Sequence, residues 1–184
     1  MNHPRFFGYG SLVNFDTHSY PEPKAAKLQG WRRVWRHTNI RDFAFLSVEP
    51  HEGTVLLGAT ALVPNADFEA LDEREFAYAR RPVAHQVTPE HDEVVVYEVE
   101  EGYFAEPSTA HPVLLSYLDV VVQGYHRLFG DDGVKHFFDT TMGWESLPVL
   151  DDRDAPLYPR ACLLTDKETA LVDAYLKERG QPQG

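Results

Sequence analysis

The sequence is poor in the residues that mark secreted, metal-binding or nucleic-acid-binding proteins. Only one of the 184 residues is a cysteine, Cys162, so an internal disulfide and a cysteine-rich zinc site are both excluded. Basic residues are also scarce: the chain has 17 Lys and Arg and 29 Asp and Glu, which gives a net charge of −12. Such a field repels phosphate backbones and anionic membrane surfaces, so we expect neither nucleic acid nor membrane as a partner.

Long apolar runs and metal-ligand motifs are missing as well. Only Phe6 and Phe7 follow Arg5 before Gly8 interrupts the run, which is too short for a signal peptide, and no later run approaches the ~20 residues that cross a bilayer. The nine histidines form no His-Glu-x-x-His pattern. We therefore expect a cytoplasmic protein without a metal.

The overall composition is that of a folded globular chain. Hydrophobic residues make up 43% and charged residues 25%, and no internal repeat is visible. A chain of this length has room for one core, so we expect a single domain over residues 1–180 with a frayed tail at 181–184.

The first hundred residues alternate in the manner of strands. A turn at Pro50–Gly53 predicts a hairpin between two of these strands. Because strand twist accumulates and closure removes sheet edges, about six strands in this space favour a curled, barrel-like sheet. The expected strands are Arg5–Tyr9, Leu28–Thr38, Phe43–Val48, Thr54–Val63, Arg81–Val87 and Glu93–Val99.

The second half changes to helical spacing. The pattern predicts helices over Leu114–Phe129, ending at Gly130, and over Asp131–Phe138. A last helix begins at Thr165, which forms a capping-box pattern with Glu168. The fold class expected is therefore α+β, a small mixed barrel-like sheet with surrounding helices.

A glycine-rich segment, Phe7-Gly8-Tyr9-Gly10-Ser11-Leu12, follows the first predicted strand. Glycines on both sides of a tyrosine let the main chain bend and expose successive N–H groups, which can hold a carboxylate or an oxyanion. An ordinary strand-ending turn explains the spacing equally well. The segment matches neither a phosphate loop nor a nucleophile elbow, which disfavours a serine hydrolase.

Glu75 lies in a predicted short helix over Asn65–Tyr78. On a helical wheel it falls within roughly 60° of Phe68 and Leu71, so burial of those side chains would draw its carboxylate inward and raise its pKa. Asp72 lies near the edge of the same stripe and remains a competitor. A surface ion pair between Glu75 and Arg74 or Arg80 is the alternative.

Three further groups of residues invite a functional interpretation. Arg41 and Arg32 belong to a segment over residues 24–41 that has six basic and no acidic residues. These two arginines are candidates for contacts with the carboxylates of a ligand, and a solvated strand face is the alternative. Tyr78 could bond Glu75 or the substrate, or could be a core tyrosine. The loop that starts at Asp151–Asp154 is either a lid or an acidic loop with an internal ion pair.

Taken together, these segments resemble the γ-glutamylcyclotransferase-like superfamily, nearest to its bacterial ChaC-type and related branches. The likeness rests on the opening Phe7–Leu12, on Leu28–Arg33, and on Leu71–Glu75 with Tyr78 and Val83 behind it. It extends more weakly through Gln123-Gly124, Asp151-Asp152-Arg153 and Pro156-Leu157-Tyr158-Pro159. Val13-Asn14 and Phe76 depart from the better-known patterns of the family.

The resemblance implies a site and an activity. It implies a pocket lined by Tyr9, Gly10, Ser11 and Leu12, with Glu75 as the catalytic acid and base. The implied substrate is a small anionic γ-glutamyl peptide or amine, glutathione among the candidates, which would be cyclised to 5-oxoproline without a cofactor. A pocket that binds such a compound without turnover is the alternative.

Overall fold

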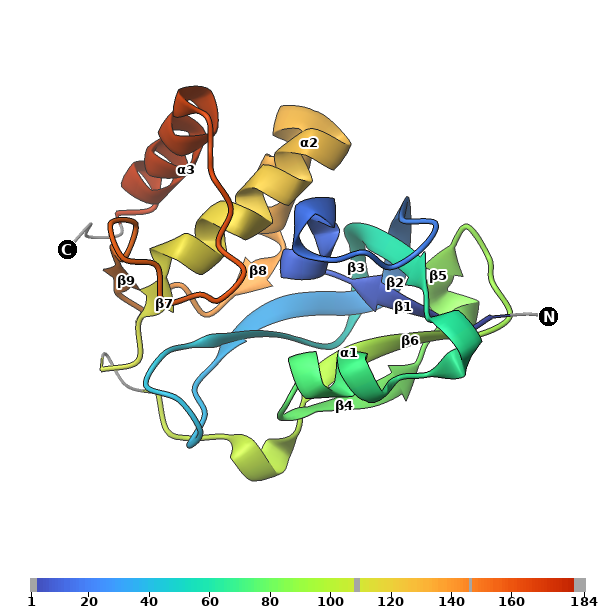
Figure 1. Cartoon of the computed structure of the whole chain (residues 1–184). Coiled ribbons are helices and arrows are strands. Elements are labelled where there is room, and N and C mark those ends of the chain that lie inside the picture. Colours follow the sequence, from blue (N-terminus) through green and yellow to red (C-terminus); the bar gives the residue numbers. More distant parts are fainter. Residues whose placement is uncertain (1–2, 108–109, 146, 181–184) are drawn as a thin grey trace.

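A curled seven-stranded sheet dominates the computed structural model, which describes residues 3–107, 110–145 and 147–180 (Figure 1). The strand order is β4-β6-β1-β3-β2-β5, with β8 beside β2; β1 runs parallel to β6 and β2 parallel to β8. The end strands β4 and β5 do not pair with each other, so the sheet is a half-barrel, and the predicted α+β class is confirmed. The strands are β1 (Arg5–Gly8), β2 (Lys24–Arg36), β3 (Phe45–Leu62), β4 (Tyr78–Pro82), β5 (Val87–Thr88), β6 (Val94–Val99) and β8 (Thr141–Met142).

Strand β1 is central and buried on both faces. Because successive side chains of a strand point to opposite faces, Phe7 enters the large core beneath the long helices, whereas Phe6 enters a smaller core with Leu71. The main chain that leaves β1 therefore emerges between two packed layers. The 3₁₀ turns Ser11–Val13 and Phe15–Thr17 follow it directly.

Helix α2 (Leu115–Asp139) packs against one face of the sheet, and α3 (Asp166–Glu178) packs beside α2 (Figure 1). Helix α2 bends sharply at Gly130, whose φ of 69° is left-handed, as the predicted break between two helices requires. Helix α3 begins with the predicted capping box of Thr165 and Glu168. A two-stranded parallel sheet, β7 (Val113–Leu114) and β9 (Val149–Leu150), lies at the start of α2.

The predicted hairpin at Pro50–Gly53 is wrong. Residues 45–62 form one strand, because the continuous strand β2 pairs with both of its halves. Trp31 pairs with Pro50 and Gln29 with Val55, so the turn-forming residues between them leave the ladder as an exposed bulge.

Two other predicted boundaries are also wrong. The short helix expected over residues 65–78 is only α1 (Glu69–Arg74), because the chain reverses at Ala77, with φ of 80°, to place Tyr78 in β4 beside β6. The strand expected over Arg81–Val87 is interrupted by the 3₁₀ turn Ala84–Gln86 after Pro82, which has no N–H to donate to a ladder.

The described residues include no helix with the length and hydropathy needed to span a bilayer. They also contain no cluster of three or more His, Cys, Asp or Glu side chains that could hold a metal ion. The tail at 181–184 lies outside the described residues.

Candidate functional site

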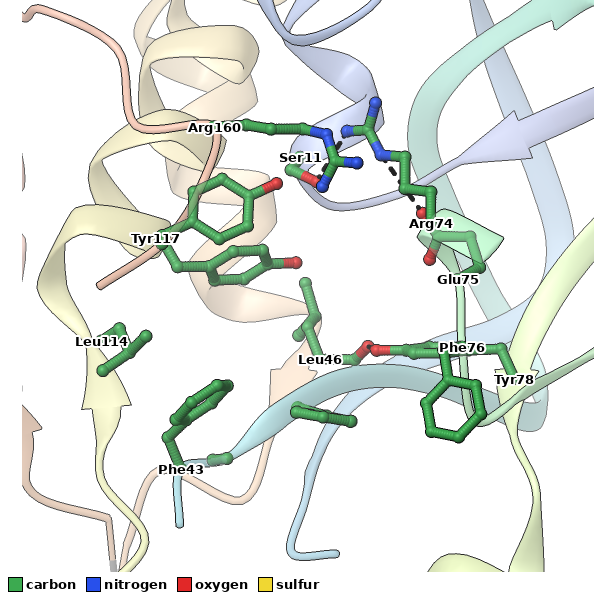
Figure 2. Close-up of a pocket in the computed structure, with 13 residues that line it drawn as sticks. Ser11, Phe43, Leu46, Arg74, Glu75, Phe76, Tyr78, Leu114, Tyr117 and Arg160 are labelled. Atoms are coloured by element: carbon green, nitrogen blue, oxygen red, sulfur yellow. Dashed lines mark hydrogen bonds and ion pairs between the residues drawn. The ribbon is translucent and has the colours of Figure 1, made fainter. Parts of the chain in front are cut away.

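A cavity of about 150 Å³ opens where five segments far apart in the sequence meet (Figure 2). These segments are the turn after β1, the start of β3, the end of α1 with the start of β4, the start of α2, and the loop before α3. The cavity is lined by Ser11, Phe43, Ala44, Phe45, Leu46, Arg74, Glu75, Phe76, Tyr78, Leu114, Tyr117, Tyr158 and Arg160. Both segments emphasised by the sequence, the glycine-rich opening and the Glu75 region, contribute to it.

Glu75 lies in the wall of this cavity and not on the outer surface. It occupies the C-cap position after α1, with φ of −95° and ψ of 39°, so its direction is set by the end of the helix and not by a helical stripe. Its side chain is 16% exposed. The competitor Asp72 is half-exposed, accepts a hydrogen bond from Tyr97 and pairs with Arg80 outside the cavity.

The surroundings of the Glu75 carboxyl shift its pKa. Burial raises the pKa of its carboxyl, and the positive charges of Arg74 and Arg160 oppose that rise without cancelling it. Arg74 Nε lies 3.5 Å from Glu75 Oε1, so the ion pair considered from the sequence exists, although both of its side chains are largely buried. A carboxylate held this way can accept and return a proton closer to neutral pH than a solvated one.

Arg74 ties Glu75 to the turn after β1. Its guanidinium donates to Ser11 Oγ at 3.3 Å, and to the main-chain oxygen and the hydroxyl of Thr17, both at 3.0 Å. The two dashed lines in Figure 2 show how this arginine bridges Ser11 and Glu75. The N–H groups of Arg74 are therefore used in contacts within the protein, and this arginine is not available to bind a ligand.

The glycine-rich loop contributes to the cavity through Ser11. Tyr9 is buried, and its hydroxyl donates to the Tyr97 carbonyl at 2.7 Å, while Leu12 packs in the smaller core. Neither of these side chains lines the cavity, and Gly10 lies directly behind the Tyr117 hydroxyl. The loop therefore supports the cavity wall from behind, and Ser11 is the residue through which it lines the cavity.

Tyrosines form much of the remaining wall. Tyr78 lines the cavity, but its hydroxyl donates to the Leu46 carbonyl at 2.7 Å. Tyr117 stacks edge-on against Tyr158, with ring centroids 5.0 Å apart. Burial raises the pKa of Tyr117, while a hydrogen bond with the main chain of Ser11 opposes that rise, so its hydroxyl is a neutral donor at the cavity surface.

Arg160 is the lining cation that remains available for a ligand. Among the described residues, none forms a hydrogen bond or ion pair with its guanidinium, although its charge reaches Glu75 and opposes the rise in the pKa of that carboxyl. Figure 2 shows it beside Ser11, facing Arg74 across the same end of the cavity. An anionic group bound there would lie next to the Glu75 carboxyl.

The basic segment expected to bind substrate carboxylates lies elsewhere. Arg41 is exposed and does not line the cavity, and Arg32 pairs with Glu49 at 2.6 Å. Arg33 of the same segment is fully buried and donates to the Tyr9 carbonyl at 2.8 Å. The segment therefore supports the loop after β1 through its buried arginine.

The loop before α3 is anchored by bonds to the helices and not by an internal ion pair. Asp152 accepts hydrogen bonds from the main-chain N–H and the hydroxyl of Ser116, at 2.8 and 2.6 Å. Arg153 forms ion pairs with Asp119 of α2 and Asp173 of α3, each at 2.8 Å. This anchoring fixes the following residues, including Tyr158 and Arg160, over the cavity.

Sequence reasoning did not assign a role to Tyr117, Tyr158 or Arg160. Tyr117 lies in a helix where the pattern shows only an apolar face, and Arg160 follows a proline-rich loop without periodicity. The one available signal was Pro156-Leu157-Tyr158-Pro159, which extends the family resemblance into that loop.

No family model and no curated protein matches this chain. Solved structures do. A structure named γ-glutamyl cyclotransferase matches with a TM-score of 0.56 and 12% identity, over 94% of this chain and 99% of its own. An uncharacterised protein from Homo sapiens matches with a TM-score of 0.56 and 11% identity, over 94% of this chain and 99% of its own.

YkqA from Bacillus subtilis matches with a TM-score of 0.58 and 18% identity, over 78% of this chain and 57% of its own, so this chain spans little more than half of YkqA. At sequence identities this low, the similarity concerns the fold and not the function. The chain has the γ-glutamyl cyclotransferase fold.

Proposed function

We propose that this protein is a γ-glutamyl cyclotransferase that converts a γ-glutamyl peptide or amine to 5-oxoproline and the free amine. The observation that carries the proposal is the buried carboxyl of Glu75, with its raised pKa, in the wall of a cavity that also offers the available cation Arg160. The fold likeness supports it, and so does the resemblance of the opening segment to the ChaC-type branch. A cytoplasmic location, expected from the single cysteine, is part of the same proposal.

The substrate would bind by its amino-acid head. The α-carboxylate would pair with Arg160, which places the α-ammonium beside Glu75 at the same end of the cavity. The γ-carbonyl oxygen would then accept a hydrogen bond from the Tyr117 hydroxyl, which lies against the main chain of Ser11.

Glu75 would carry the proton through the reaction. Its ionised carboxylate accepts a proton from the α-ammonium, and the freed amine attacks the γ-carbonyl carbon of the same molecule. A C–N bond of the five-membered ring forms, and the original amide C–N bond breaks as Glu75 returns the proton to the departing nitrogen. The ring nitrogen then loses its second proton, which passes by way of Glu75 to the released amine, so the products are 5-oxoproline and an ammonium ion. Atoms and charge balance without a cofactor.

The decisive experiment is release of 5-oxoproline by the purified protein. Glutathione, γ-glutamyl amino acids and γ-glutamyl amines would each be incubated with the wild-type chain, with the Glu75→Gln variant as the blank, and the product measured by mass spectrometry. We expect at least one compound to be cyclised by the wild type only. If compounds bind, as shown by calorimetry, and none is cyclised, the chain is a binding module that uses the same cavity.

A further inference from the structure

The cavity has two chemically different ends. Figure 2 shows Arg74, Glu75 and Arg160 gathered with Ser11 at one end, while Phe43 and Phe76 lie at the other. The apolar end is completed by Phe45, whose ring lies 5.7 Å from that of Phe43. A ligand that fills the cavity must therefore be charged at one end and apolar at the other.

All the positive charge of the lining is at the Glu75 end. Arg74 is occupied by Ser11, Thr17 and Glu75, which leaves Arg160 to bind one carboxylate. Among the described residues, no lysine, arginine or histidine lines the aromatic end. The neighbours in sequence, Arg41 and Asp42, are exposed, carry opposite charges and lie outside the lining.

The aromatic end is also unusually exposed. Phe76 is 60% exposed, and the side chains of Phe43 and Phe45 are half-buried. The cavity itself, at about 150 Å³, matches one that holds a single benzene molecule, so it has room for a compact head group and not for a whole peptide. The rest of a substrate would extend over the exposed rings, which a flat apolar group would cover.

We propose that the departing amine of the substrate is apolar, with an aromatic ring, and carries no carboxylate of its own. The inference rests on the proposed function and narrows it from γ-glutamyl compounds in general to γ-glutamyl arylalkylamines. The α-carboxylate of the head uses Arg160, so a second carboxylate on the amine would lie among phenyl rings and lose hydration without gaining a partner.

The test compares two substrates that differ by one carboxylate. γ-Glutamylphenethylamide and γ-glutamylphenylalanine share the head and the ring, and kcat/KM for 5-oxoproline release is measured for each. We expect kcat/KM to be about tenfold or more higher for γ-glutamylphenethylamide, which corresponds to about 1.4 kcal/mol in the free energy of the transition state. Equal rates, or a preference for γ-glutamylphenylalanine, would overturn the inference.

A charge introduced at the aromatic end should reverse the preference. Because Phe76 is exposed, Phe76→Arg is expected to fold and to raise kcat/KM for γ-glutamylphenylalanine by about tenfold while lowering it for the amide. The matched control is Leu163→Arg, which adds the same charge at a side chain that is 96% exposed and outside the cavity. The control should leave the ratio of the two rates as in the wild type.

A binding measurement separates this inference from the proposed function. The dissociation constants of both compounds are measured on Glu75→Gln by calorimetry, where cyclisation cannot obscure binding. If γ-glutamylphenethylamide binds more tightly and the wild type cyclises neither compound, the proposed cyclotransferase activity is refuted and the inferred ligand class is supported. If the wild type cyclises both compounds at equal rates, the cyclotransferase activity is supported and the inferred ligand class is refuted. If neither compound binds or is cyclised, the activity and the ligand class are both refuted.

Discussion

Replacement of Glu75 by glutamine removes one ionisable oxygen and keeps the shape of the side chain. The carboxylate lies in the cavity wall with a raised pKa, and the glutamine amide could neither accept the proton of the α-ammonium nor return it to the departing amine. General acid–base groups contribute about 10²–10⁴-fold, so we expect kcat/KM to fall by that factor, or about 3–5 kcal/mol in the barrier. Glu75→Asp, which withdraws the carboxylate by about one methylene, should cost about 10²-fold.

The same substitution should stabilise the folded chain. Burial raises the pKa of Glu75, so the folded state binds the proton more tightly than the unfolded state does. Stability is then full below the ordinary carboxyl pKa and declines as the pH rises through the raised value. The glutamine amide cannot ionise, so the variant should melt at a higher temperature than the wild type at pH 7, and the two should converge as the pH falls to about 4.

The wild-type activity should show the same group in its pH dependence. Since Glu75 must be ionised to accept the proton, kcat/KM should fall on the acid side through a pKa above that of an ordinary glutamate. Glu73→Gln is the matched control, because Glu73 lies in the same helix with its side chain exposed and outside the cavity. Its rates and melting temperature should be those of the wild type.

The reasoning would be refuted by a Glu75→Gln variant that is as active as the wild type, or by one that is inactive and also less stable at pH 7. The first result would remove Glu75 from the chemistry. The second would make the carboxylate a structural ion-pair partner of Arg74. Calorimetric melting and 5-oxoproline release on the same preparations distinguish the two results.

Two further substitutions test the support of the cavity and of the last helix. Gly10→Ala would place a methyl group 2.6 Å from the Tyr117 hydroxyl, so the ring must move in the cavity. We expect KM to rise and the protein to lose about 1–3 kcal/mol of stability, and an unchanged KM would contradict this role for the loop. Glu168 has its pKa lowered to about 2 by its bonds with Gln123 and Arg127, so its stabilisation is present above the ordinary carboxyl pKa and is lost as the pH falls toward 2. Glu168→Gln should therefore lower the free energy of unfolding, measured in urea at pH 7, by at most about 3 kcal/mol. The loss should be smaller than this limit because solvent screens the half-exposed Arg127. Near pH 2 the variant and the wild type should be equally stable.

Local sequence patterns were sufficient for the elements whose signals are chemical and short-range. The capping box of Thr165 and Glu168 and the left-handed break at Gly130 both appear where the sequence predicts them. The turn signal at Pro50–Gly53 failed because a turn-forming segment becomes a bulge when one continuous partner strand pairs on both sides of it. Only the pairing with β2, which is a long-range contact, could reveal that.

The sequence by itself determined that a carboxylate lies near the apolar stripe of a short helix and that a bent main chain follows the first strand. Their chemical types and their neighbours in the chain are local properties, and both segments line the cavity through Glu75 and Ser11. Tertiary structure alone decided which cation and which rings face them. Arg160 and Phe43 reach the cavity because separate segments converge on one end of a curled sheet, and no pattern within either segment encodes that convergence.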